Sequence, residues 1–120
     1  MGARDEFQEQ LTALGFKPDA REDARVSFPY TIPVGRFAGT EVRLGFEVPP
    51  EFPRTPPSGP HISPRLQPLN PNAPAHPERV HESPFGSDWQ YWSRPYPDWG
   101  KDGRTVAAYM AYVRHLFATV

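Results

Sequence analysis

The stretch that decides the fold is "FEVPPEFPRTPPSGPHI", residues 46–62. It begins as an apolar strand and then becomes rich in proline, which fixes φ and has no backbone N–H to donate to a sheet. The chain therefore forms a strand and then leaves the hydrogen-bonded ladder. We expect the turn that follows to be structural, because proline has little conformational freedom to lose on folding. The residues that define this proline turn are Phe52, Pro53, Pro56 and Pro57.

Alternating apolar residues predict β-strands on both sides of the proline turn. Residues 25–32 and 40–48 alternate apolar with polar side chains, and a turn with two glycines separates them. We therefore expect an antiparallel hairpin. Pro29 lies inside the first run and favours an edge strand, and a third, shorter strand is expected at residues 61–66. The apolar positions are Val26, Phe28, Tyr30 and Ile32, then Val42, Leu44, Phe46 and Val48.

Helical spacing of apolar residues occurs near both ends of the chain. Phe7, Leu11 and Leu14 form a short stripe, and Gly15 is expected to end that helix. A longer helix is expected after Asp102, which is its predicted N-cap. Its apolar stripe comprises Val106, Tyr109, Met110, Val113, Leu116 and Phe117.

Residues 67–100 show no hydrophobic period. They are rich in proline and aromatic residues, and we expect a long Pro/Trp-rich flap without regular structure. The predicted fold class is therefore α+β, with an N-terminal helix, an antiparallel β-meander of three to four strands, this flap, and a C-terminal helix packed on the sheet.

Composition excludes several classes of function. The 120 residues include 13 basic and 14 acidic ones, so we expect one domain over residues 1–120 and no nucleic-acid partner. No apolar run reaches the ~18 residues of a membrane span, and residues 1–6 lack a signal-peptide core. We expect a cytoplasmic protein without a membrane partner.

The sequence contains no cysteine, which excludes disulfides, thiolate nucleophiles and cysteine-based zinc sites within it.

The predicted order of elements, together with "FEVPPEFPRTPP" (residues 46–57), resembles the ubiquitin-conjugating (UBC) family. In that family an aromatic-Pro-x-x-Pro-Pro segment follows a strand, as residues 52–57 do here. A His-Pro pair comes later, as His76 and Pro77 do here. The stretch "DWQYWSRPYPDW" (residues 88–99) before a helix is similar to the bacterial, cysteine-poor branch of that superfamily, encoded beside ubiquitin-like proteins. The resemblance implies a ubiquitin-like protein or an activating enzyme as partner, and no cofactor.

The resemblance also implies where a conjugating enzyme carries its cysteine, a short way after the His-Pro pair. The corresponding residues 76–89, "HPERVHESPFGSDW", contain none. Ser83 and Ser87 are the nearest chemical substitutes, and His81 is the only base that the sequence places near Ser83. His76 completes the set of candidate catalytic residues. A serine would form an oxyester, which is more stable and less transferable than a thioester, so we expect no catalysis.

His76 and His81 also have the H-x4-H spacing found in some zinc sites. A zinc site needs three or four ligands, and the only other candidates nearby are Glu78, Glu82 and Asp88. We therefore expect no metal.

Five aromatic residues gather between residues 89 and 99. Most of them are expected to be buried, because a flap without regular structure needs large side chains to hold it. Tryptophan and tyrosine also dominate binding surfaces, and Tyr91, Trp92 and Trp89 are the predicted partner-binding residues. The five are Trp89, Tyr91, Trp92, Tyr96 and Trp99.

Three functions remain open at this point. The first is a UBC-like domain without the catalytic cysteine, which binds a ubiquitin-like protein or an activating enzyme and transfers nothing. The second is an active conjugating enzyme that uses Ser83 or Ser87, or one whose natural cysteine has been replaced. The third is a small α+β interaction module that binds a proline- or sugar-bearing ligand through its tryptophans. The proline turn itself is alternatively a polyproline ligand for an SH3-type module.

Overall fold

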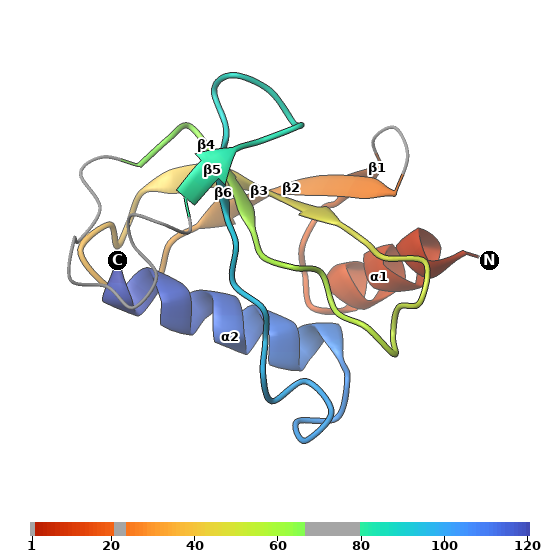
Figure 1. The fold of residues 1–120 in the computed structure, drawn as a ribbon. Coiled ribbons are helices and arrows are strands. Elements are labelled where there is room, and N and C mark those ends of the chain that lie inside the picture. Colours follow the sequence, from red (N-terminus) through yellow and green to blue (C-terminus); the bar gives the residue numbers. More distant parts are fainter. Residues whose placement is uncertain (1, 21–23, 67–79) are drawn as a thin grey trace.

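The computed structural model describes residues 2–20, 24–66 and 80–120. Helix α1 (Ala3–Ala13) comes first and helix α2 (Val106–Thr119) last. Between them the described residues form one antiparallel sheet in the order β1-β2-β3-β4-β6-β5, and both helices lie on the same side of it (Figure 1). The α+β class is confirmed. The strands are β1 (Asp19–Ala20), β2 (Arg25–Thr31), β3 (Glu41–Glu47), β4 (His61–Ser63), β5 (Val80–Glu82) and β6 (Gln90–Trp92).

The predicted hairpin is formed by β2 and β3, and Pro29 lies where its missing N–H is harmless. The N–H of Ile32 donates to the carbonyl of Thr40. The backbone N–H and C=O groups of even-numbered β2 residues therefore bond to β3, and those of odd-numbered residues point away from β3, toward the opposite edge of β2. On that side the short strand β1, which the sequence did not predict, pairs with β2 only at Val26 and Ser27. The second half of β2 is therefore an edge, and a proline there discourages the addition of another strand.

The inner face of the sheet, which the two helices cover, carries the apolar residues of the alternating runs. The ring of Phe46 on β3 lies 5.6 Å from that of Phe7 on α1 and 5.3 Å from that of Tyr109 on α2. The side chain of Gln10 on α1 accepts a hydrogen bond from the N–H of Val106 at 2.9 Å, and so satisfies one of the donors that begin α2. One aromatic cluster thus joins the sheet to both helices.

Helix α2 packs on the sheet through the predicted stripe, and all six residues of that stripe are buried. Its N-cap is Thr105, whose hydroxyl accepts from the N–H of Ala108 at 3.1 Å. The prediction of Asp102 as N-cap is wrong, because Asp102 accepts a hydrogen bond from Tyr96 instead. No helix of the described residues is long and apolar enough to cross a membrane.

Helix α1 buries Phe7 and Leu11 but not Leu14, whose exposed fraction is 44%. The expectation that Leu14 extends the buried stripe is wrong, because the helix ends at Ala13 and Leu14 is the residue that follows it. Gly15 has a φ of 95°, a left-handed conformation that favours glycine and ends the helix as predicted.

The proline turn connects β3 to β4 and belongs to the core. Phe52 is 4% exposed, and its ring lies 6.0 Å from that of Trp99. The carbonyl of Pro53 accepts from the indole N–H of Trp99 at 2.8 Å, and the carbonyl of Pro57 accepts from the hydroxyl of Tyr109 at 3.3 Å. The prolines donate no hydrogen bond, but their carbonyls hold two buried aromatic side chains in place.

The prediction that residues 67–100 lack regular structure is wrong for the part that the structure describes. β5 and β6 form an antiparallel pair, and β6 lies between β5 and β4. The pairing extends beyond the N-terminal end of β4. The N–H of Trp92 donates to the carbonyl of Pro60 and that of Arg94 donates to the carbonyl of Ser58, both at 2.9 Å. Strands this short cannot show a period, so only the pairing reveals them. Residues 67–79 lie outside the described residues.

We predict that the proline turn stabilises the domain. Replacing Pro56, which is half-buried, and Pro57, which is buried, with alanine should lower the free energy of unfolding by about 1–2 kcal/mol more than the control below, through lost packing, since the gain in unfolded-chain entropy is common to both. Urea denaturation measures the change. The matched control is the double variant Pro50→Ala and Pro97→Ala, both exposed, which should lose only the contribution of unfolded-chain entropy. Equal midpoints for the two double variants would contradict a structural role.

Candidate functional site

The outer face of the sheet, opposite α2, carries one continuous row of side chains across all six strands. The strand pairing sets this row, because residues directly opposite each other in an antiparallel pair lie on the same face. At its centre His61 lies between Gly45 on one neighbouring strand and Tyr91 on the other. The full row is Asp19, Ser27, Gly45, His61, Tyr91 and His81.

The 83–89 loop, which joins β5 to β6, covers the centre of this row. It lies on the side of the sheet opposite α2 (Figure 1). Gly45 makes the contact possible, because a Cβ there would lie 2.6 Å from the ring of Phe85, well inside van der Waals contact. Phe85 and Trp89 pack with tilted rings whose centroids are 4.9 Å apart, and each is 7% exposed. Two aromatic residues of the loop thus bury part of the outer face.

Arg65, just after β4, bonds both to the strand residue that precedes the 83–89 loop and to the loop itself. Its guanidinium donates to the Glu82 carboxylate at 2.6 Å and to the backbone carbonyl of Ser87 at 3.1 Å. The loop is therefore fixed by a charged contact at one side and by Phe85 and Trp89 at the other.

Three polar side chains, one on the loop, one on β4 and one at the end of β3, form the Glu47–His61–Ser83 site. The Nδ1 atom of His61 lies 2.8 Å from the hydroxyl oxygen of Ser83, and its Nε2 atom lies 3.7 Å from a carboxylate oxygen of Glu47. The same hydroxyl oxygen accepts from the N–H of Phe85 at 3.1 Å. The imidazole is stacked against Tyr91, with centroids 4.4 Å apart, and its exposed fraction is 1%.

Burial controls the protonation of His61. Desolvation, assisted by the positive charge of Arg25, lowers the pKa of His61 from 6.5 to about 4. The imidazole is therefore neutral near pH 7. Glu47 lies between His61 and Arg25: one of its carboxylate oxygens faces His61, and the other is 3.4 Å from Nε of Arg25.

The structure changes the pairing expected for Ser83. The sequence interpretation paired it with His81, but His81 is exposed and the histidine that contacts Ser83 is His61. The statement that His81 is the only nearby base is therefore wrong. Ser87 is exposed and uses its backbone carbonyl to bind Arg65. His76 lies outside the described residues.

His61 was not predicted as a site residue, and the reason is physical. It alternates with apolar Ile62 on a short strand, a position at which a polar side chain is ordinarily exposed and carries no signal of its own. Its burial comes from the 83–89 loop, more than twenty positions along the chain. The only local signal is Gly45, a glycine inside a strand, which often marks the close approach of another segment.

The aromatic cluster of residues 89–99 is divided between the two faces. Trp92 is 1% exposed and packs on Phe117 of α2, with ring centroids 5.2 Å apart. The expectation that Trp92 offers an exposed contact to a partner is wrong, because its position in β6 points it inward. Trp89 and Trp99 are 7% and 5% exposed, which leaves no tryptophan free to stack on a sugar. Tyr91, on the outer face, is half-buried, and its hydroxyl lies 2.6 Å from that of Ser58.

No three histidine, aspartate or glutamate side chains gather in a way that could hold a metal ion among residues 2–20, 24–66 and 80–120. The absence of a metal site stays a prediction, since His76 and Glu78 lie outside these ranges.

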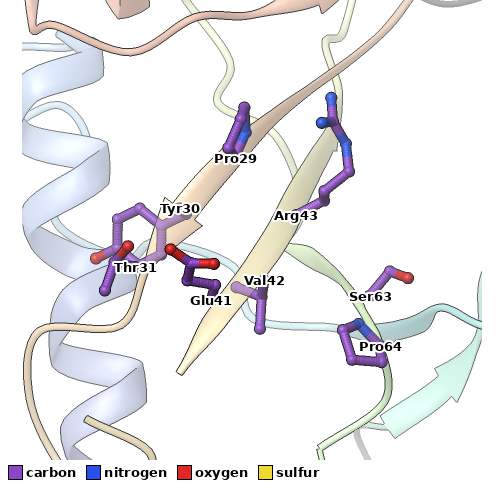
Figure 2. Close-up of a pocket in the computed structure, with 8 residues that line it drawn as sticks. All are labelled: Pro29, Tyr30, Thr31, Glu41, Val42, Arg43, Ser63 and Pro64. Atoms are coloured by element: carbon purple, nitrogen blue, oxygen red, sulfur yellow. The ribbon is translucent and has the colours of Figure 1, made fainter. Parts of the chain in front are cut away.

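A shallow hollow lies farther along the outer face, between β2, β3 and the end of β4. Figure 2 shows Arg43 at one end and Glu41 beside Tyr30 at the other. Arg43 is already engaged, because its guanidinium donates to Asp19 at 2.8 Å. The hollow is open to solvent, so it is unsuited to burying most of a small ligand. The remaining lining residues are Pro29, Thr31, Val42, Ser63 and Pro64.

Comparison of this chain with protein-family models, with curated proteins and with solved structures found no match.

We predict that His61 makes stability depend on pH. Its pKa is 6.5 in the unfolded chain and about 4 in the folded one, so the unfolded state binds more protons between these values. The free energy of unfolding should be highest above pH 6.5 and fall as pH drops toward 4, by up to about 3 kcal/mol from this group. Denaturation measured at several pH values tests this.

The informative quantity is the slope of stability against pH, since carboxylates also titrate below pH 5. His61→Gln should flatten the slope between pH 6.5 and 5, whereas His115→Gln, at an exposed position of α2, should leave it unchanged. Identical slopes for wild type and His61→Gln would show that His61 is not buried in its neutral form.

Proposed function

We propose that this chain is a UBC-like domain that binds a ubiquitin-like protein, or the activating enzyme that carries one, and transfers nothing itself. The observation that carries the proposal is the combination of a helix–sheet–helix order with a sequence that has no cysteine. The order is the one that the resemblance implies, and without a thiol the thioester intermediate of conjugation has no site.

The chemistry of serine supports the absence of transfer. An oxyester on Ser83 or Ser87 would be a poorer acyl donor to an amine than a thioester. Ser83 is also half-buried, and its hydroxyl oxygen already accepts from the N–H of Phe85. A hydroxyl held in this way is badly placed to receive the tail of a bulky protein.

The outer face supports a protein as the partner. It offers a broad surface with a shallow open hollow, and protein partners bind over such areas through a few aromatic anchors. Tyr91 and the exposed His81 lie side by side there, with ring centroids 6.0 Å apart. Of the three predicted partner-binding residues, Tyr91 alone lies on this face without being almost completely buried.

A second candidate is an active conjugating enzyme with Ser83 as the nucleophile. The observation that favours it is the 2.8 Å contact between Ser83 and His61, which supplies the adjacent base that a serine nucleophile needs.

We predict that Tyr91→Ala weakens binding of the proposed ubiquitin-like partner by about 10-fold or more, as expected for an aromatic anchor. Isothermal titration calorimetry measures the affinity. The matched control is Leu14→Ala, which removes an exposed apolar side chain at the end of α1 and should not change the affinity. Equal loss in both variants, or none in Tyr91→Ala, would contradict binding at this part of the outer face.

We further predict that no thiol-sensitive adduct forms when the chain is incubated with an activating enzyme, ATP and the ubiquitin-like protein. Gel electrophoresis with and without reductant, followed by hydroxide treatment, distinguishes the two candidate functions. A thiol-resistant, hydroxide-labile adduct that disappears in Ser83→Ala and persists in Ser87→Ala would establish the enzyme and overturn the binding-only proposal.

A further inference from the structure

The Glu47–His61–Ser83 site has the connectivity of a nucleophilic serine relay. A carboxylate, an imidazole and a hydroxyl follow one another at 3.7 Å and 2.8 Å. Such a relay works because the imidazole takes the hydroxyl proton while the carboxylate orients the ring and stabilises its charged form. Here Nδ1 faces the serine and Nε2 faces the carboxylate, and either ring nitrogen can fill either role.

The contacts of Ser83 allow its hydroxyl to donate to His61 when the imidazole carries its hydrogen on Nε2. The oxygen of Ser83 accepts from the N–H of Phe85 at 3.1 Å, so its own hydrogen is available for Nδ1 of His61. In that arrangement Nδ1 is the acceptor, and the ring hydrogen lies on Nε2, toward Glu47. Ring contacts with Tyr91 at 4.4 Å and Phe85 at 4.7 Å prevent the imidazole from turning.

We infer that Ser83 is a nucleophile for small activated acyl esters, with His61 as its general base and Glu47 as the group that orients His61. The serine oxygen attacks the acyl carbonyl carbon and its proton passes to Nδ1 of His61. The bond from carbon to the leaving alcohol or phenol breaks, and the leaving group takes that proton. Water then attacks the acyl-serine ester by the same route, which releases the acid and restores the hydroxyl. This activity does not depend on the proposed binding function.

The charges around the site determine the rate and the pH range of this chemistry. His61 is neutral near pH 7, as a general base must be, because its pKa lies at about 4. The groups that face it are Glu47, Arg25 and Tyr91. A base of low pKa transfers protons slowly, so the ester hydrolysis is expected to be slow but to persist in mildly acidic solution.

Ester hydrolysis and conjugation require different reactivity of the acyl-serine intermediate. Conjugation needs an intermediate that an amine can attack, whereas hydrolysis needs only an ester that water can attack. Part of Ser83 is accessible, which admits a small probe more easily than the tail of a folded protein.

The test uses the whole chain with a fluorophosphonate probe, which leaves a phosphonyl group on the serine oxygen as fluoride departs and His61 takes the hydroxyl proton, and reads out by intact mass and peptide mapping. We expect one modification, at Ser83, and none in Ser83→Ala. Ser87→Ala is the matched control on the same loop and should react like wild type. Glu47→Gln changes an exposed position that should not disturb folding, and should slow the reaction on the order of 10-fold.

The pH profile separates a reactive site from a merely structural hydrogen bond. The rate of modification should hold between pH 8 and 5 and fall only near pH 4, where His61 acquires its proton. An unmodified wild-type chain at pH 7, modification at Ser87 instead, or a rate unchanged in Glu47→Gln would each overturn the inference. None of these outcomes bears on binding of the ubiquitin-like protein, so the two proposals fail independently.

Discussion

The structure depends on the contact of Phe46 with Phe7 on one side and Tyr109 on the other, at 5.6 and 5.3 Å between ring centroids. This contact joins strand β3 to both helices, so the inner face of the sheet is covered by side chains that come from three separate parts of the sequence. Aromatic side chains bury large areas and prefer such tilted and edge-on pairs. Because the inner face is closed in this way, a partner that binds the sheet does so on its outer face.

The proline turn ends strand β3 inside the core and leaves few backbone N–H groups there that need a partner. A segment rich in proline cannot extend the sheet, yet it leaves every carbonyl available as an acceptor. Here the carbonyls of Pro53 and Pro57 are used by Trp99 and Tyr109. A stretch with few hydrogen-bond donors therefore supplies acceptors to Trp99 and Tyr109, two core side chains from the C-terminal part of the chain.

Elements with a clear period were predictable from the sequence, and elements fixed by distant contacts were not. The β2–β3 hairpin and the buried stripe of α2 follow from alternation and helical spacing over seven and fourteen residues. β5 and β6 have three residues each, too few to show a period. Of the candidate site, Ser83 was identified because it lies near the position expected for a cysteine. Its partner His61 was missed because no local rule connects a strand residue to a loop more than twenty positions away.

The outer face shows how one small residue sets the chemistry of a site. A side chain at Gly45 would meet the ring of Phe85, so the absence of one lets the 83–89 loop rest directly on the sheet. That contact buries His61, and burial keeps it neutral by lowering its pKa to about 4. The loop also brings Ser83 to within 2.8 Å of the ring. A hydroxyl and a neutral imidazole held together in this way stabilise the loop whether or not they react, so the geometry that presents Tyr91 on the outer face is also the geometry that directs the Ser83 hydroxyl toward a base.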